Sequence, residues 1–141
     1  MLALDPIKEA LADALGLGEE DWSDRVGDAV AEVVFRLSAR FPQVVAEGWW
    51  RGARRNRALG EFAGALEVFC YCDPQLAASR MRSRLGAGRH PIHRDVISPS
   101  ILGQAAAVIP LGLGAALIQV DTGQPGAPDR AVDAVTAALG R

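Results

Sequence analysis

The sequence has few cysteines and no long hydrophobic run. Its two cysteines, Cys70 and Cys72, flank a single residue and are not expected to bridge, so no disulfide framework is predicted. No window reaches the ~20 consecutive apolar residues that a membrane span needs, and the first residues do not resemble a signal peptide. These absences predict a cytoplasmic protein that is neither exported nor embedded in a membrane.

A large excess of charge of one sign is also absent. The 15 basic and 17 acidic side chains give a net charge of −2, which argues against a protein that binds nucleic acids or membrane surfaces over its whole surface. The charge is uneven, because residues 51–94 carry nine basic and three acidic groups. With 141 residues and a 50% hydrophobic share, the chain is expected to form one globular domain, residues 1–141.

Short apolar runs alternate with helical patterns along the chain. Apolar runs predict strands at residues 2–4, 44–47, 66–72 and 115–120. Asp5, Ser23 and Asp73 are expected to cap helices. Helical patterns span residues 6–15, 23–41, 51–62, 74–85, 101–108 and those after 128. Strands that are separated by helices and not alternating in polarity predict an α/β fold, with a parallel sheet covered by helices on both faces.

Polar groups follow the predicted strands. In parallel sheets of this kind, ligands bind beyond the carboxyl ends of the strands. The side chains at these ends are Asp5, Glu47 with Trp49 and Trp50, Asp73, and Asp121 with Thr122. The strand ends therefore predict a ligand site that is rich in carboxylates.

Arginines are concentrated after the third predicted strand. Arg80 and Arg84 are four residues apart and share a helix face. The segment Arg89-His90-Pro91-Ile92-His93-Arg94 follows them. Guanidinium groups suit bidentate recognition of phosphate, although a solvated arginine surface is the alternative interpretation.

The order of these motifs resembles the small P-loop kinases that are often grouped with AAA-family ATPases, including chloramphenicol-phosphotransferase-like and zeta-toxin-like proteins. The resemblance covers almost the whole chain, from the helix start at Asp5 to the turn at Asp121 and Thr122. It implies a P-loop NTPase-like fold that uses ATP and Mg²⁺ to phosphorylate a hydroxyl group of a small molecule. The identity of that small molecule stays open.

One motif of the family is missing. The phosphate-binding sequence G-x-x-x-x-G-K-S/T does not occur, and the single lysine, Lys8, is followed by Glu9. The resemblance therefore implies an incomplete member that begins at the second strand, without the first strand, the P-loop and the first helix. Efficient ATP turnover is expected to be lost, and two strands are expected to have open edges.

The resemblance also assigns the phosphoryl-transfer roles. Asp5 would be the general base or a second-shell partner of Mg²⁺, with a plain helix cap as the alternative. Arg80 and Arg84 would stabilise the transferred phosphoryl group from a lid-like segment at residues 80–99, and Arg89 would contribute to phosphate binding.

Substrate and adenine positions follow from the same resemblance. Glu47 would orient the substrate and Trp49 and Trp50 would form an apolar wall, although a strand-end carboxylate and two packing indoles explain them equally well. The adenine would be bordered by the residues after the last predicted strand, Asp121, Thr122 and Gly123. An ordinary turn explains these three residues equally well.

Three other interpretations remain. A metal site formed by Cys70, Cys72, His90 and His93 is less favoured than core cysteines and lid histidines. The arginines of residues 51–57, beside two tryptophans, could bind single-stranded nucleic acid, although a solvated helix face or a surface for an anionic substrate is favoured. The whole chain could also be a non-catalytic remnant that binds a nucleotide, an anion or a partner protein.

Overall fold

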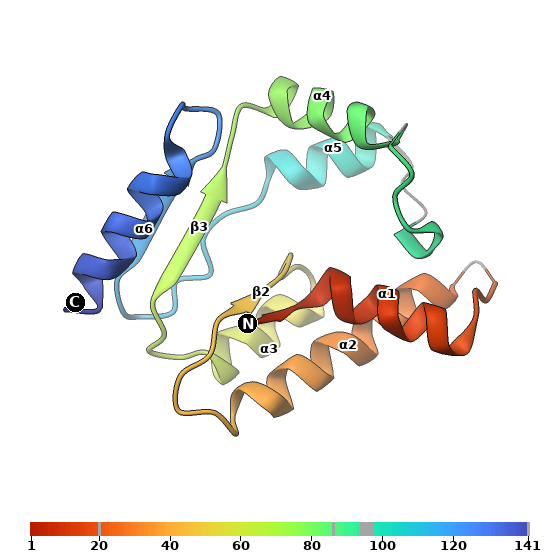
Figure 1. The fold of residues 1–141 in the computed structure, drawn as a ribbon, viewed down its shortest axis with the longest axis horizontal. Helices are drawn as coiled ribbons and strands as arrows, with labels where there is room; N and C mark the ends of the chain where they lie inside the picture. The colour runs from red at the N-terminus through yellow and green to blue at the C-terminus, as the bar shows by residue number, and fades with distance from the viewer. Residues whose placement is uncertain (20, 86, 94–97, 141) are drawn as a thin grey trace. The chain divides into compact units, whose positions relative to one another are not determined.

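The computed structural model describes residues 1–19, 21–85, 87–93 and 98–140. Short parallel strands and helices alternate along the chain (Figure 1). Within the described residues, none of the helices is long and apolar enough to cross a bilayer. The helices are α1 (Leu4–Leu15), α2 (Trp22–Ser38), α3 (Ala53–Glu61), α4 (Pro74–Leu85), the 3₁₀ helix η1 (Pro91–His93), α5 (Pro99–Ala106) and α6 (Ala127–Ala138). The strands are β1 (Leu2–Ala3), β2 (Ala46–Glu47), β3 (Glu67–Tyr71) and β4 (Leu117–Asp121).

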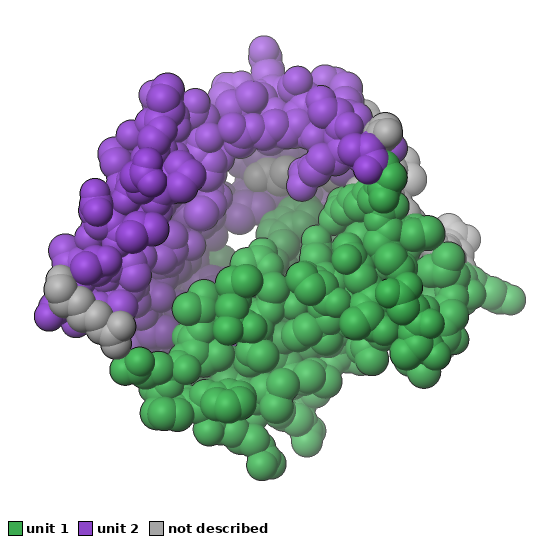
Figure 2. Space-filling model, viewed as in Figure 1, with its two compact units in different colours: residues 1–61, 88–95 green, residues 62–87, 96–141 purple. Residues whose placement is uncertain are grey.

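The chain divides into two compact units, which Figure 2 shows in different colours. Unit 1 comprises Met1–Glu61 and Gly88–Asp95, and unit 2 comprises Phe62–Ala87 and Val96–Arg141. The predicted lid-like segment, residues 80–99, is therefore shared between the two units. Parts of that segment, residues 86 and 94–97, lie outside the described residues.

Unit 1 is built around α2 and a short parallel strand pair. β1 pairs with β2 in parallel, with Leu2 opposite Ala46 and Ala3 opposite Glu47. The buried face of α2 includes Val30 and Val34, which are fully enclosed. α2 contacts α1, α3 and β1, so these apolar side chains form the core of the unit.

Unit 2 contains the longer strand pair. β3 and β4 run parallel over five residue pairs, from Glu67 opposite Leu117 to Tyr71 opposite Asp121. α6 packs against β4, and α4 contacts α5. The predicted parallel pairing is confirmed, although the described strands form two separate pairs.

Two predicted helix caps are wrong and one is confirmed. α1 begins at Leu4, which places Asp5 and Pro6 inside the first turn. Proline is tolerated there because first-turn N–H groups have no intrahelical acceptor. Ser23 likewise lies inside α2, which begins at Trp22. Asp73 does cap α4, because its Oδ1 accepts hydrogen bonds from the backbone N–H groups of residues 75 and 76 at 2.8 and 3.2 Å.

Candidate functional site

Asp5 and Glu47 lie near each other at the carboxyl ends of the paired strands β1 and β2. Glu47 stands opposite Ala3, and Asp5 follows Ala3 by two residues in the first turn of α1. Glu47 is exposed as a residue, but partial burial of its carboxyl group, followed by repulsion from Asp5, raises its pKa. The strand register thus brings together two of the carboxylates that the sequence places at strand ends.

Arg89 contacts Asp5 directly. Its Nη2 donates to Oδ2 of Asp5 at 3.0 Å, across 84 residues of sequence. The sequence singles out both side chains, one for phosphate and one for a substrate proton, but it gives no sign that they pair.

Two histidine–carboxylate contacts also hold residues 89–93, which we call the strap, on α1. Asp5, Glu9 and Asp13 follow one another at intervals of four residues and so share one face of the helix. Nε2 of His93 lies 2.7 Å from Oε1 of Glu9, and Nε2 of His90 lies 3.1 Å from Oδ1 of Asp13. The regular acidic spacing is a signal in the sequence from which this contact could have been predicted.

An apolar residue and a buried hydroxyl complete the attachment of the strap. Ile92 is 1% exposed, and its carbonyl accepts a hydrogen bond from Oγ of Ser23 at 2.6 Å. Burying such a side chain contributes about 1.5–3 kcal/mol, whereas an exposed ion pair contributes about 0–1 kcal/mol. Ile92 is therefore the main anchor of the strap, and the polar contacts fix the orientation of its polar side chains.

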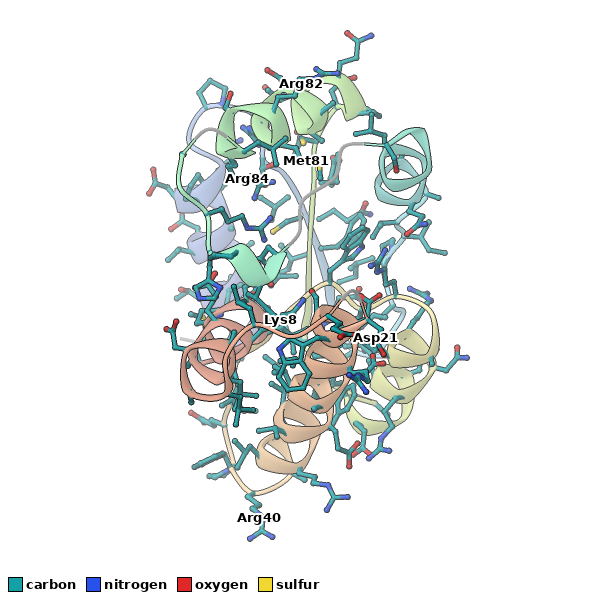
Figure 3. All side chains as sticks on the ribbon, turned by 90° about the vertical axis from the view of Figure 1, so that its right-hand side faces the viewer. Lys8, Asp21, Arg40, Met81, Arg82 and Arg84 are labelled. Atoms are coloured by element: carbon teal, nitrogen blue, oxygen red, sulfur yellow. The ribbon has the colours of Figure 1, made fainter. Side chains whose placement is uncertain are left out.

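Lys8 lies beside these groups, on α1 (Figure 3). Its Nζ donates to Oγ of Ser23 at 2.8 Å. Burial lowers the pKa of Lys8, and the nearby carboxylates of Asp24 and Asp5 oppose that effect. In the sequence, Lys8 mattered only because it is the single lysine and is not part of a phosphate-binding loop. In the structure it lies near Asp5 and the strap.

The two predicted wall residues differ in their surroundings. The ring of Trp50 packs 5.2 Å from that of Phe35, so it contributes to the core of unit 1. Trp49 is exposed, and the guanidinium of Arg51 lies 4.4 Å from the centre of its ring. Packing thus accounts for Trp50, while Trp49 keeps an accessible indole beside the strand end that carries Glu47.

In unit 2, Arg80 and Arg84 line one open hollow of about 590 Å³. Arg80 donates from Nη1 to Oγ1 of Thr122 at 3.1 Å and from Nη2 to its carbonyl at 2.8 Å. The guanidinium of Arg84, labelled in Figure 3, has no hydrogen-bond or ion-pair partner among the described residues, although its backbone carbonyl accepts from the N–H of Ala87. Of the two arginines, Arg84 therefore has the more available guanidinium, with the hydroxyls of Ser79 and Ser83 beside it in the hollow.

The turn after β4 is internally bonded. Oδ1 of Asp121 accepts from the backbone N–H of Gly123 at 2.9 Å, and Oγ1 of Thr122 donates to the carbonyl of Tyr71 at 3.0 Å. A Cβ on Gly123 would lie 3.1 Å from Oδ1 of Asp121, so glycine suits this close approach. These bonds support the ordinary-turn interpretation, and the adenine role of residues 121–123 stays a prediction.

The possible cysteine and histidine metal site is not assembled within either unit. The sequence favours core cysteines, and for Cys70 this is wrong, because Cys70 is exposed on β3 while Cys72 is half-buried. The cysteines belong to unit 2, whereas His90 and His93 belong to unit 1. The described part of the chain contains no group of three or more His, Cys, Asp or Glu side chains that could hold a metal ion. ATP and Mg²⁺ stay predictions, because Mg²⁺ is usually held by one or two carboxylates together with waters and substrate phosphates.

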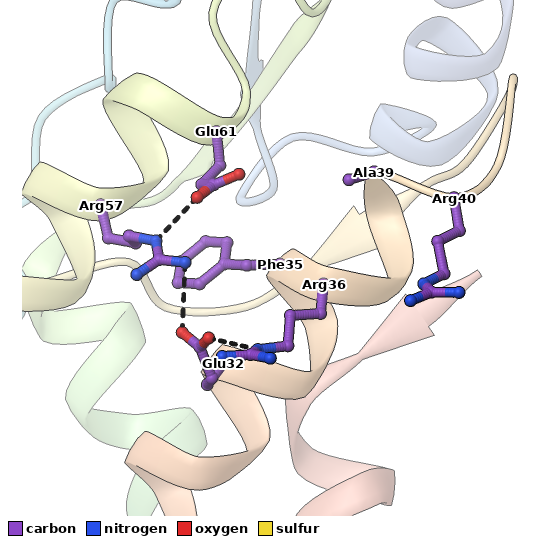
Figure 4. Close-up of a pocket in the computed structure, with 7 residues that line it drawn as sticks. All are labelled: Glu32, Phe35, Arg36, Ala39, Arg40, Arg57 and Glu61. Carbon is purple, nitrogen blue, oxygen red and sulfur yellow. Dashed lines mark hydrogen bonds and ion pairs between the residues drawn. The ribbon is translucent and has the colours of Figure 1, made fainter.

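A second hollow, of about 330 Å³, lies in unit 1 between α2 and α3 (Figure 4). Glu32 accepts from Nε of Arg36 at 2.6 Å, and this hydrogen bond lowers the pKa of Glu32. Arg57 pairs with Glu32 at 3.3 Å and with Glu61 at 2.8 Å. The charges that line the hollow largely neutralise one another.

The arginines of α3 are also engaged with neighbouring groups. Nε of Arg54 donates to Oδ1 of Asp28 at 2.7 Å, and Arg57 binds two glutamates. The predicted basic helix is confirmed, but it presents fewer available guanidinium groups for single-stranded nucleic acid than the sequence alone indicates.

Comparison with known proteins identifies a similar solved structure. No protein-family model matches the sequence, and no curated protein matches it. The crystal structure of a protein from Chloroflexus aurantiacus, described as a "putative kinase", superposes with a TM-score of 0.82 and 27% sequence identity. The match covers 97% of this chain and 82% of that chain. The chain therefore has a kinase-like α/β fold.

Proposed function

We propose that this protein is an ATP-dependent phosphotransferase of the P-loop kinase type, acting on a hydroxyl group of a small molecule. The kinase-like fold supports the reaction class. The observation that carries the proposal is the parallel register of β1 and β2, which puts Asp5 beside Glu47 at one strand end. Ligands of parallel sheets bind at such ends.

In the proposed reaction, Asp5 accepts the proton of the substrate hydroxyl. The hydroxyl oxygen forms a bond to the γ-phosphorus of ATP, the bond from that phosphorus to the bridging oxygen breaks, and ADP leaves. Glu47 orients the substrate by accepting a hydrogen bond, and the indole of Trp49 borders it. A positioned general base contributes about 10²–10⁴-fold to such a step.

Efficient transfer also needs a phosphate-binding loop. The 141 residues contain no G-x-x-x-x-G-K-S/T sequence, so they supply neither its backbone N–H groups nor its lysine. We therefore expect negligible ATP turnover from this chain by itself. A chain that also carries such a loop is expected to be active.

The test begins with the codons upstream of Met1. If they encode G-x-x-x-x-G-K-S/T in frame, the extended protein and the 141-residue chain should be incubated with Mg·ATP and a panel of sugars, nucleosides, antibiotics and hydroxy-amino acids. Mass spectrometry is expected to detect a phosphorylated acceptor only with the extended protein. Asp5→Asn should reduce transfer by about 10²–10⁴-fold.

Asp129→Asn provides the matched control, because Asp129 is an exposed carboxylate in the first turn of another helix, α6. It should leave transfer unchanged. An upstream stop codon, or an Asp5→Asn protein that is as active as the parent, would contradict the proposal.

A non-catalytic binding protein is the second candidate function. The available guanidinium of Arg84 and the hydroxyls of its hollow favour weak binding of a nucleotide or another anion. In this case the 141-residue chain should bind ATP without turnover. Replacing Arg80 and Arg84 together by alanine should abolish that binding in a calorimetric titration.

A further inference from the structure

The strap covers the carboxylate on which the proposed reaction depends. Arg89 donates to Oδ2 of Asp5 at 3.0 Å, and Nδ1 of His93 lies 4.0 Å from Oδ1. A carboxylate oxygen that accepts from a guanidinium has less room to accept from a substrate hydroxyl. The carboxylate of Asp5 is therefore already engaged as the hydrogen-bond acceptor of Arg89.

The two ends of the strap are held to different degrees. Ile92 is enclosed and bonded through its carbonyl to Ser23, and the His93 side chain, 6% exposed, is bonded to Glu9. The Asp5 and Arg89 side chains are 58% and 28% exposed. Arg89 can therefore change partner while the buried part of the strap stays in place.

Arg89 lies in a group of mixed charge. Burial lowers the pKa of Lys8 most, the carboxylates of Asp24 and Asp5 raise it, and Arg54 and Arg89 lower it, so Lys8 has both cations and carboxylates near it. A phosphate group offers a guanidinium two acceptor oxygens and more negative charge than one carboxylate. A phosphate that enters beside Asp5 would therefore compete with Asp5 for Arg89.

We infer that the Asp5–Arg89 pair is an autoinhibitory contact that polyphosphate releases. With no phosphate bound, the guanidinium of Arg89 pairs with the carboxylate of Asp5. Phosphate groups draw Arg89 away and leave Asp5 able to accept a proton, so the base becomes available only when the phosphate donor is present. The inference rests on the proposed function for the role of Asp5, and it specifies how that role is controlled.

The contact predicts that Asp5 and phosphate bind Arg89 in competition. Inorganic pyrophosphate is the probe, titrated calorimetrically into the 141-residue chain at constant ionic strength. Asp5→Asn should tighten pyrophosphate binding by about two- to fivefold, the range that corresponds to loss of one exposed ion pair. Arg89→Gln should weaken the binding.

Two comparisons separate release of Arg89 from a general change of charge. Glu47→Gln removes a carboxylate close to Asp5 that does not pair with Arg89, so it should tighten binding less than Asp5→Asn. In the Arg89→Gln background, Asp5→Asn should give only the smaller gain that comes from removing a nearby negative charge. Equal gains in both backgrounds, equal gains from Glu47→Gln and Asp5→Asn, or no pyrophosphate binding by any of these proteins would overturn the inference.

The titration needs no phosphoryl transfer, so the inference and the proposed function can fail separately. Coupled binding of pyrophosphate together with an inactive extended protein would leave the contact in place and reject the kinase. Transfer that depends on Asp5, combined with uncoupled pyrophosphate binding, would do the reverse.

Discussion

The pKa values of two glutamates in unit 1 are shifted by their surroundings. Partial burial of its carboxyl group raises the pKa of Glu47, and repulsion from the carboxylate of Asp5 raises it further. Glu32 accepts a hydrogen bond from Arg36 and its pKa is lowered. Two glutamates of one unit are therefore shifted in opposite directions by their neighbours, and opposite dependences of stability on pH follow.

Glu47→Gln should make the protein more stable at neutral pH. A raised folded pKa means that the stability linked to Glu47 is present below the unfolded pKa and is lost as the pH rises through the folded pKa. The amide removes that loss, so its advantage should be largest near pH 7 and shrink as the pH falls toward about 4.3, the ordinary pKa of glutamate. Urea unfolding at several pH values measures this difference.

Glu32→Gln is the control with the opposite sign. The lowered folded pKa of Glu32 contributes stability that is present above the unfolded pKa and is lost as the pH falls through the folded pKa. The amide should therefore be slightly less stable than the parent near pH 7 and equal to it in acid. Shifts of the same sign for both variants would contradict the assignment of the two environments.

At the scale of elements, the three-residue helix η1 depends on tertiary contacts. So short a helix is not stable by itself, yet η1 carries the enclosed Ile92 and contacts α1. The polar contacts on either side of Ile92 each involve a carboxylate that is at least partly exposed, on Asp5 and Asp13 before it and on Glu9 after it. The apolar side chain is therefore expected to determine whether this segment stays on α1.

Ile92→Ala should lower the free energy of unfolding by about 2–5 kcal/mol, the usual cost of truncating an enclosed aliphatic side chain. Ile109→Ala is matched in chemistry, but Ile109 is 63% exposed, so it should change stability by no more than about 0.5 kcal/mol. Denaturant unfolding followed by tryptophan fluorescence measures the Ile92 effect, and unfolding followed by far-ultraviolet circular dichroism measures the effect at Ile109, which belongs to unit 2. A change at Ile92 no larger than that at Ile109 would contradict the role of this side chain.

At the scale of the whole molecule, the aromatic residues are divided between the two units. All three tryptophans belong to unit 1, and the single tyrosine, Tyr71, belongs to unit 2. Each unit also has buried apolar residues of its own, Val30 in the first and Val120 in the second. Tryptophan fluorescence therefore reports on unit 1, whereas far-ultraviolet circular dichroism reports on both units.

The two units are expected to unfold in separate transitions, because each has its own core. Val120→Ala should destabilise unit 2 by about 1.5–3 kcal/mol, moving the circular dichroism transition but not the fluorescence midpoint. Val30→Ala should move the fluorescence midpoint by a similar free energy. Coincident transitions that both variants shift equally would show a single cooperative unit instead.

The sequence by itself determined what depends on near neighbours. The cap at Asp73, the helical stripe through Val30 and Val34, and the carboxylates that follow short apolar runs involve residues within a few positions of one another. Periodicity and capping rules describe such local contacts. The α/β class and the parallel strands followed from them.

Only the tertiary structure decided which of these groups meet. Arg89 reaches Asp5 across 84 residues, Ser23 bonds the strap across 69, and Arg80 bonds Thr122 across 42. Ser23 has the same local sequence signal whether it caps a helix or binds a distant carbonyl, and Arg80 has the same signal whether it binds phosphate or a turn. These outcomes depend on the path of the chain between the partners, and local spacing contains no information about that path.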